Sequence, residues 1–266
     1  MVLPPGGLYG NGALDWKEAT LTSDLLLFKA KGVSADTANL SIKALDTDAE
    51  LAFNTKNVKT TLDFENEIGT FESNNKKDAN TEMPYNQYKT SLDKFSWNMK
   101  AQTIHFESSA GAGGSFLSTR RDQDSLNFTA SKASYDLATN ILNIEGVPFI
   151  QVADATIYPD EGQVTVQAQA KMDMLQNARI LANRTNQYHT INKANVQIFS
   201  RKNYKASGYY EYNIAGKEQE IKFSDIVVKK TKSKKYVTKA SGYVGCLLYT
   251  SPSPRDLSTS RMPSSA

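Results

Sequence analysis

Apolar and polar residues alternate along most of this chain with a period of two. The longest example runs from Val164 to Met174 without a break. Shorter examples lie at 62–64, 104–106, 126–130, 142–144, 196–198 and 221–223. Strict alternation is typical of a β-strand with one face on a core and the other face in solvent. The pattern therefore predicts an all-β protein.

One segment also has helical features. Residues 167–183 are rich in Ala, Met, Leu and Gln, which favour helices. Met174, Ala178 and Leu181 supply part of the spacing of an amphipathic helix. The alternation that reaches Met174 favours a strand instead, so we expect a strand here.

Turn-forming residues separate the alternating runs. The segment Tyr158–Gly162 places Pro and Gly where a type I turn prefers them. Hairpin tips are predicted at 138–140 and 215–217. Two stretches rich in polar residues or glycine, 73–84 and 108–115, are predicted to be loops that leave a regular scaffold.

A short pattern recurs along the chain: small, polar, polar or small, Ala, polar, large apolar. The copies lie at 35–40, 130–135 and 152–157, with weaker ones at 176–180 and 192–196. In the second half they recur roughly every 16–23 residues, a length that suits one turn or hairpin of a β-solenoid. The small residue lets neighbouring strands approach closely, and the large residue fills the core.

Composition excludes some functions without indicating one. The net charge of +3 is too small to argue for nucleic acid or a membrane surface as partner. The single cysteine, Cys246, allows no disulfide framework within the chain and no multi-thiolate metal site. No apolar run approaches the roughly 20 residues of a transmembrane helix. The first residues lack the charged and apolar regions of a signal peptide.

The last residues differ from the rest. Segments 246–256 and 260–266 resemble the in-frame translation of a sequencing adapter and of the primer that follows it. We therefore expect 246–266 to be a non-native, disordered tail and exclude it from fold reasoning. Residues 1–245 are expected to form a single β-repeat region that is a fragment of a longer protein.

A family resemblance is carried by residues 133–148, which read ASYDLATNILNIEGVP. This phrase resembles the repeat unit of the OstA/LptA-like domains, and Val152–Tyr158 resembles the start of the next unit. The similarity is clearest over 126–158. It implies an elongated β-solenoid or open β-jelly roll, built from repeated strands and hairpins around an apolar interior groove. Domains of this family carry lipopolysaccharide across the periplasm. Such a likeness informs the fold more than the activity.

The resemblance implies that the interior shields acyl chains during lipid or lipopolysaccharide transport. The apolar residues expected to line that groove are Val164, Val166, Met172, Met174, Ile180, Val196 and Ile198.

A basic run lies where a hairpin tip is expected, between two apolar segments. Its lysines are Lys229, Lys230, Lys232, Lys234 and Lys235. Clustered lysines suit a polyanion such as lipid headgroups or lipopolysaccharide phosphates. Lysines at an exposed tip also discourage strand-to-strand aggregation, so a plain solvated hairpin is the other interpretation.

The chain carries little recognisable chemistry. His105 and His189 are its two histidines, and neither has a second metal ligand at a useful spacing. No phosphate-binding loop, nucleophile elbow or HExxH motif occurs. Segment 122–124 offers too few oxygen ligands for a calcium loop. We expect no catalytic residues, no metal site and no cofactor.

The β pattern and the lack of recognisable chemistry predict a non-enzymatic β-repeat protein, and the resemblance implies that it belongs to a bacterial cell envelope, in the periplasm or associated with the outer membrane. Its expected role is a lipid or lipopolysaccharide transport scaffold. Its expected partners are lipid and other β-repeat segments of the same or a partner chain, and nucleic acid is not expected. The alternative is a structural or adhesive surface repeat with its function in exposed loops such as 73–84. A β-helical carbohydrate-active enzyme would need converging charged groups, and the sequence indicates no such set.

Overall fold

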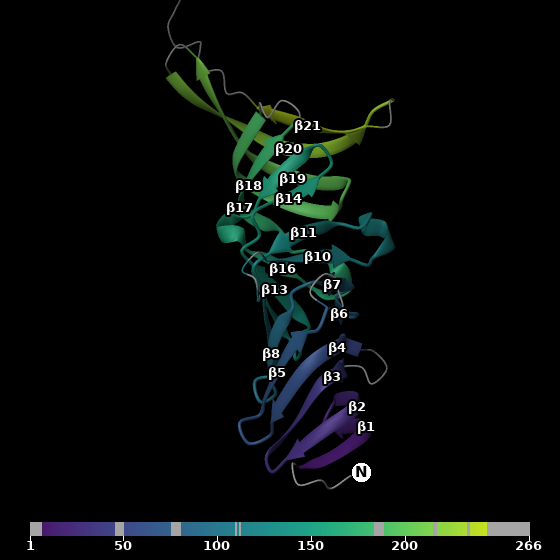
Figure 1. Ribbon diagram of the computed structural model, residues 1–266. Helices are drawn as coiled ribbons and strands as arrows, with labels where there is room; N and C mark the ends of the chain where they lie inside the picture. The colour runs from purple at the N-terminus through teal and green to yellow at the C-terminus, as the bar shows by residue number, and fades with distance from the viewer. Residues whose placement is uncertain are drawn as a thin grey trace, which may run out of the picture.

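The structure is a computed structural model that describes residues 7–45, 51–75, 81–109, 111, 113–183, 189–214, 217–232 and 235–243. Its strands stack into an elongated column, with the first strands at one end and the last strands at the other (Figure 1). The tail 246–266, residues 215–216 of one predicted hairpin tip, Lys234 and parts of the predicted loops 73–84 and 108–115 lie outside the described residues.

The prediction of an all-β protein is confirmed. The described residues form strands and three short 3-10 helices, with no α-helix among them. The strands are β1 (Leu8–Trp16), β2 (Ala19–Lys29), β3 (Gly32–Lys43), β4 (Leu51–Asp63), β5 (Ile68–Ser73), β6 (Thr81–Met83), β7 (Tyr88–Thr90), β8 (Lys94–Asn98), β9 (Thr103–Glu107), β10 (Gly114–Ser118), β11 (Asn127–Ala130), β12 (Lys132–Asp136), β13 (Ile141–Glu145), β14 (Ile150–Val152), β15 (Ala155–Tyr158), β16 (Val164–Val166), β17 (Leu175–Ala182), β18 (His189–Ser200), β19 (Asn203–Ile214), β20 (Lys217–Lys230) and β21 (Tyr236–Tyr243). The 3-10 helices are η1 (Arg121–Gln123), η2 (Asp160–Gly162) and η3 (Ala168–Ala170).

All strands belong to one antiparallel sheet that is not closed, and the sheet divides at β4. The end of β4 pairs with β5, whereas its middle pairs with β6. The first ladder continues through β8, β9, β12, β13 and β16. The second ladder continues through β7, β10, β11, β14, β15 and β17. The two ladders meet again where Val166 of β16 pairs with Met172, just before β17.

Long strands at both ends of the column pass from one ladder to the other by bending. The pairing register shifts in the middle of these strands, as between Ala35 and Leu40 in β3. Three residues at such positions, Asn57, Asn177 and Lys193, have φ of 55°, 50° and 49°. A residue with positive φ at a β-bulge bends its strand and increases the local twist. The bulges therefore allow one strand to contribute to both faces of the core.

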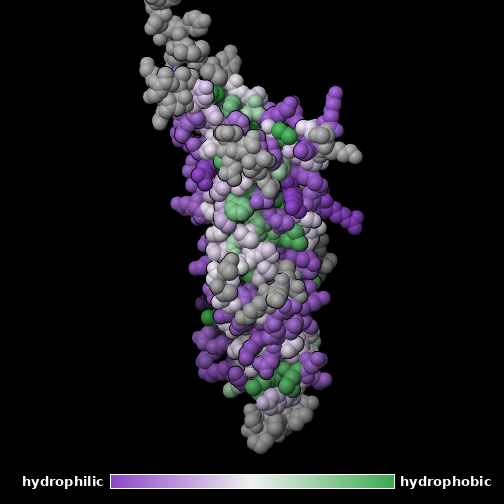
Figure 2. All heavy atoms as spheres, turned by 45° about the horizontal axis from the view of Figure 1, so that its top comes forward, coloured by the Kyte–Doolittle hydropathy of each residue, from purple (hydrophilic) through white to green (hydrophobic). Residues whose placement is uncertain are grey.

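The inward side chains of both ladders form one hydrophobic core that extends from Ala19 to Ile226. Aromatic rings fill its N-terminal half. Phe71 stacks on Phe95 with ring centroids 4.6 Å apart, and Phe53 meets the same Phe95 edge-on at 5.3 Å. The outer surface is mostly hydrophilic in the view of Figure 2, with only small hydrophobic patches. This division is what the period-two pattern predicts.

The short repeated pattern marks inward positions. Its alanines are each at most 4% exposed and its large apolar residues are fully buried. The alanines are Ala38, Ala133, Ala155, Ala178 and Ala194, and the large residues are Leu40, Tyr135, Ile157, Ile180 and Val196. The expectation that the large residue fills the core is confirmed.

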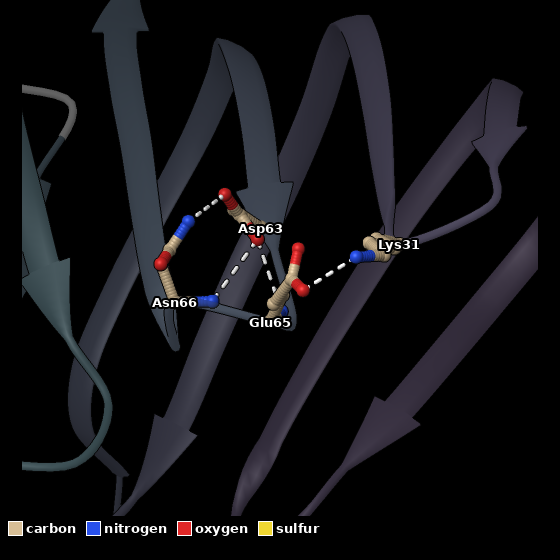
Figure 3. Close-up of polar contacts among 4 residues, drawn as sticks. All are labelled: Lys31, Asp63, Glu65 and Asn66. Atoms are coloured by element: carbon tan, nitrogen blue, oxygen red, sulfur yellow. Dashed lines mark hydrogen bonds and ion pairs between the residues drawn. The ribbon is translucent and has the colours of Figure 1, made fainter.

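Three hairpins of the first ladder repeat one design: 59–72, 94–107 and 132–145. In each, Asp or Asn ends the first strand and its side-chain oxygen accepts backbone hydrogen bonds from the turn. Asp63 accepts from the N–H groups of Glu65 and Asn66 at 2.9 and 3.1 Å (Figure 3). The Asn66 side chain and backbone stabilise the carboxylate and lower the pKa of Asp63. The predicted tip at 138–140 belongs to the third of these hairpins.

The turns of these hairpins stack on one another through single backbone hydrogen bonds of 2.9 Å. Phe64 donates to the Lys31 carbonyl, Met99 to Glu67, and Leu137 to Gln102. Met99 and Leu137 are each 3% exposed, so they extend the core to the rim of the column. The Lys31–Glu65 ion pair links the β2–β3 turn to the first of these hairpin turns on the outside (Figure 3).

The prediction of one unbroken strand from Val164 to Met174 is wrong. β16 ends at Val166, and the chain turns through η3, where Gln169 and Ala170 have φ of 55° and 56°. Contacts from distant segments hold this turn, since Gln169 donates to the Tyr85 carbonyl and the Gln123 amide donates to the Ala170 carbonyl. The prediction of a strand rather than a helix is confirmed for Leu175–Ala182.

Two buried tyrosines provide a matched test of the core. The Tyr88 hydroxyl has no hydrogen-bond partner among the described residues, and burial raises its pKa. The Tyr135 hydroxyl bonds to Asn140 Oδ1 at 3.1 Å. We expect Tyr88→Phe to leave the free energy of unfolding unchanged or slightly raised, and Tyr135→Phe to lower it by about 1 kcal/mol. Urea titrations followed by circular dichroism measure both, and equal losses would contradict the assignment.

Candidate apolar ligand site

A cavity of about 390 Å³ opens at the C-terminal end of the column. It takes its walls from β17 to β21. Its lining residues are Ala182, His189, Ile191, Tyr210, Tyr212, Ile221, Phe223, Thr238 and Ala240. The lining is mainly apolar, with polar groups contributed by His189, Thr238 and the two tyrosine hydroxyls.

The bends in β18, β19 and β20 create this cavity. Ile191, Tyr210 and Ile221 lie in one register row across the three strands, whereas Thr238 and Ala240 come from β21 beyond the bend. Gly208 lies at the bend of β19, where an added Cβ would lie 2.6 Å from Ile191 Cγ2. Only glycine therefore lets β19 approach β18 this closely without displacing the wall of the cavity.

Aromatic rings form one side of the cavity. The rings of Tyr210 and Phe223 are 6.0 Å apart, and His189 lies 5.9 Å from Tyr210. Ile191 is fully packed at 2% exposure, whereas Tyr212 is 47% exposed. We call the buried side at Ile191 the floor of the cavity and the exposed side at Tyr212 its mouth. An apolar lining with a few polar groups suits a ligand with an apolar tail and a polar head.

A hydrogen-bonded chain fixes the wall at Thr238. The Tyr204 hydroxyl bonds to Thr238 Oγ1 at 2.8 Å, and Asp154 accepts from the Thr238 N–H at 2.9 Å and from its hydroxyl. Because Thr238 donates to Asp154, Tyr204 is the donor to Thr238. Burial raises the pKa of Tyr204 to about 12, and the negative charge of Asp154 acts in the same direction. Asp154 lies between β14 and β15, so these hydrogen bonds tie β21 to the body of the column.

The residues predicted to line a groove lie elsewhere in the interior. Six of them are at most 2% exposed and belong to the core: Val164, Val166, Met172, Ile180, Val196 and Ile198. The inward orientation predicted for Met174 is wrong, since its side chain is 49% exposed. Met172 is still buried after the turn at η3, and Leu175 is the next buried residue, so the alternation shifts between them and leaves Met174 on the outer face. None of the seven lines the C-terminal cavity.

The predicted lysine run lies at the β20–β21 hairpin, as expected. Lys229 and Lys230 end β20, and Lys235 precedes β21. The turn is closed by the Thr231 N–H, which donates to the Lys235 carbonyl at 2.7 Å. Lys232 is exposed, as are the other three described lysines. Their role towards a polyanion stays a prediction.

The histidines occupy different environments. His105 is exposed on the outer face of β9, as its alternation with Ile104 and Phe106 predicts, whereas His189 lines the cavity. Across the described ranges, no three His, Cys, Asp or Glu side chains are grouped as a metal site would require. The part of the chain that the structure describes also contains no helix long and apolar enough to cross a membrane.

Sequence reasoning did not find the cavity. The alternations at 221–223 and the tyrosines near 210 were visible, but they predict only apolar faces and cross-strand packing. A useful signal was that the tyrosines near 210 and the alternation at 221–223 flank the predicted hairpin tip at 215–217, so their apolar faces lie on neighbouring strands. Their convergence depends on the bend at Gly208, which no local pattern specifies.

No protein-family model, no curated protein and no solved structure matches this chain. The fold alone therefore defines its class, which is that of all-β proteins built on one open antiparallel sheet.

Tyr204 makes stability depend on alkaline pH. Its folded pKa of about 12 exceeds the value of about 10 expected in the unfolded chain. Its contribution is therefore complete below pH ~10 and is lost as the pH rises towards 12, by at most about 1.4 kcal/mol per pH unit. We expect Tyr204→Phe to flatten this decline in urea titrations between pH 9 and 11. Tyr212→Phe, at an exposed tyrosine, is the control, and identical slopes for both variants would contradict the assignment.

Proposed function

We propose that this chain is a non-enzymatic β-repeat scaffold of a bacterial cell envelope that holds the acyl part of a lipid or lipopolysaccharide. The observation that carries the proposal is the apolar cavity between β17 and β21, with its buried floor at Ile191 and its exposed mouth at Tyr212. Its volume of about 390 Å³ is that of a small ligand site. Removal of an acyl chain from water is favourable in proportion to the apolar area buried.

We propose that the acyl chain enters at this end of the column and does not lie along the length of the column. The six buried residues of the predicted groove pack within the core. A chain lying along them would have to displace side chains that are at most 2% exposed. Acyl binding at the C-terminal cavity needs no such rearrangement.

The architecture is proposed to be an open β-jelly roll of the kind that the OstA/LptA-like resemblance implies. The division of the sheet at β4, the shared core and the meeting of the ladders before β17 support this. The resemblance covers β11 to β15, which contain the third hairpin and its continuation.

The two end strands are proposed to pair with other β-repeat segments of the same or a partner chain. Among the described residues β1 pairs only with β2, and β21 pairs only with β20. Each therefore presents one edge of backbone donors and acceptors to solvent. Such edges are templates for strand addition.

The second candidate is a structural or adhesive repeat protein. The filled core favours this function, because a close-packed column resists mechanical force and needs no ligand. In that function the exposed loops would carry the binding activity and the cavity would remain empty.

A fluorescent fatty acid distinguishes the two functions. We expect cis-parinaric acid to bind the purified chain with one saturable site, and lipid to be found by mass spectrometry after mild purification. Ala240→Trp fills the mouth from the exposed edge of β21, and we expect it to weaken binding at least ten-fold. Ala101→Trp, at an exposed alanine in the turn after β8, is the matched control and keeps the affinity. Absence of saturable binding, or equal binding by both variants, would favour the structural function.

A further inference from the structure

A ladder of alternating charge crosses the outer face of the first ladder of strands. The register places opposite charges side by side at each step from β4 to β13. We call these six residues the charge ladder, and in spatial order they are Lys59, Glu72, Lys94, Glu107, Lys132 and Glu145.

The alternation is encoded by the three repeated hairpins. Each begins with Lys and ends with Glu, at 59–72, 94–107 and 132–145. The turn keeps an Asp or Asn at its start and the buried positions are mainly apolar, whereas the identities of the other residues vary. All three units therefore keep Lys at the first position and Glu at the last. Exposure to solvent alone would require only polar residues there, and not a charge of fixed sign.

Four of the six charges of the ladder make no ion pair with a described residue. Lys59 pairs with Asp36 at 3.4 Å. Lys94, Glu107, Lys132 and Glu145 make no ion pair within 4.0 Å of any described residue. All six side chains border a hollow of about 660 Å³ on this face.

We propose that this face binds a second copy of the chain, side by side, through a two-fold axis parallel to the strands and midway between β8 and β9. Such an axis reverses the order of the charge ladder. Because the ladder has an even number of alternating members, every residue then faces the opposite charge. Lys94 faces Glu107 of the second copy, Glu72 faces Lys132, and Lys59 faces Glu145. A two-fold interface requires a self-complementary patch of this kind.

The neighbouring row of residues is compatible with the same axis. It consists of Thr61, Thr70, Ser96, His105, Ser134 and Asn143, which are paired in register across the same strands. The axis places each row of one copy opposite the same row of the second copy in reverse order. Ser96 of one copy therefore faces His105 of the other, and Thr70 faces Ser134. Each of these encounters joins groups that can donate and accept hydrogen bonds.

The hollow gives room for the Lys and Glu side chains of the second copy. Twisted sheets pack with their strands about 30° apart, so contact is closest at Lys94 and Glu107 and weakens outwards. Exposed ion pairs contribute little each and are screened by salt. The association is therefore weak, wet and dependent on ionic strength. It is independent of the cavity at the other end of the column and of strand addition at β1 and β21.

Light scattering of the full chain tests the proposal, in reducing buffer because Cys246 is present. We expect a dimer at low salt that becomes a monomer at about 0.5 M salt. Glu107→Lys and Lys94→Glu each place like charges at the centre, and we expect each to raise the dissociation constant at least ten-fold. An equimolar mixture of the two variants restores the dimer, because each unlike pair is then re-formed. Glu82→Lys, on the outer face of the second ladder, is the control and has no effect.

Zero-length carbodiimide coupling tests the geometry on the unmodified chain. Lys59 and Glu145 are five strand spacings apart within one chain, about 24 Å, which is beyond the reach of this reagent. We expect mass spectrometry of the dimer to show coupling of Lys59 to Glu145 and of Glu72 to Lys132. A chain that stays monomeric at low salt overturns the proposal. A dimer that lacks these links, or that survives both charge reversals, is held by another surface, such as the end strands, and overturns it as well.

Discussion

Burial of inward side chains between the two ladders is the interaction on which the rest of this structure depends. Each ladder alone has one apolar face, and the division at β4 allows one chain to build both ladders and to turn these faces towards each other. The bulges that bend the long strands follow from the same requirement, because a strand that serves both faces must change direction between them. The column is long because each added hairpin extends the core by one step.

The repeated hairpins show how one short unit satisfies three demands at once. Its inward residues fill the core, its Asp or Asn supplies acceptors for turn N–H groups, and its terminal charges face outwards. A backbone hydrogen bond from each turn to the preceding one sets the stacking distance. The outer face therefore acquires its regular charge pattern as a consequence of repetition in the core.

The apolar cavity lies where this filling ends. In the body of the column the core residues are close-packed, whereas Tyr210 and Phe223 are only partly buried and Tyr212 is exposed. Asp154 and Tyr204 hold Thr238 in place, so the cavity has a fixed wall. The same apolar faces that stabilise the column are thus available to a ligand at this end.

The sequence by itself determined that the protein is all-β, which residues of most strands point inwards, and where several hairpins turn. These features depend on neighbours along the chain, since a period of two and an Asp or Asn turn are local properties. The tertiary structure alone decided that the sheet divides, that Met174 faces solvent although Met172 is buried, and that His189 meets Tyr210. Each of these depends on which distant strands pair and where they bend. Alternation specifies a face for every strand but no partner, because the backbone hydrogen bonds that join strands are the same for every sequence.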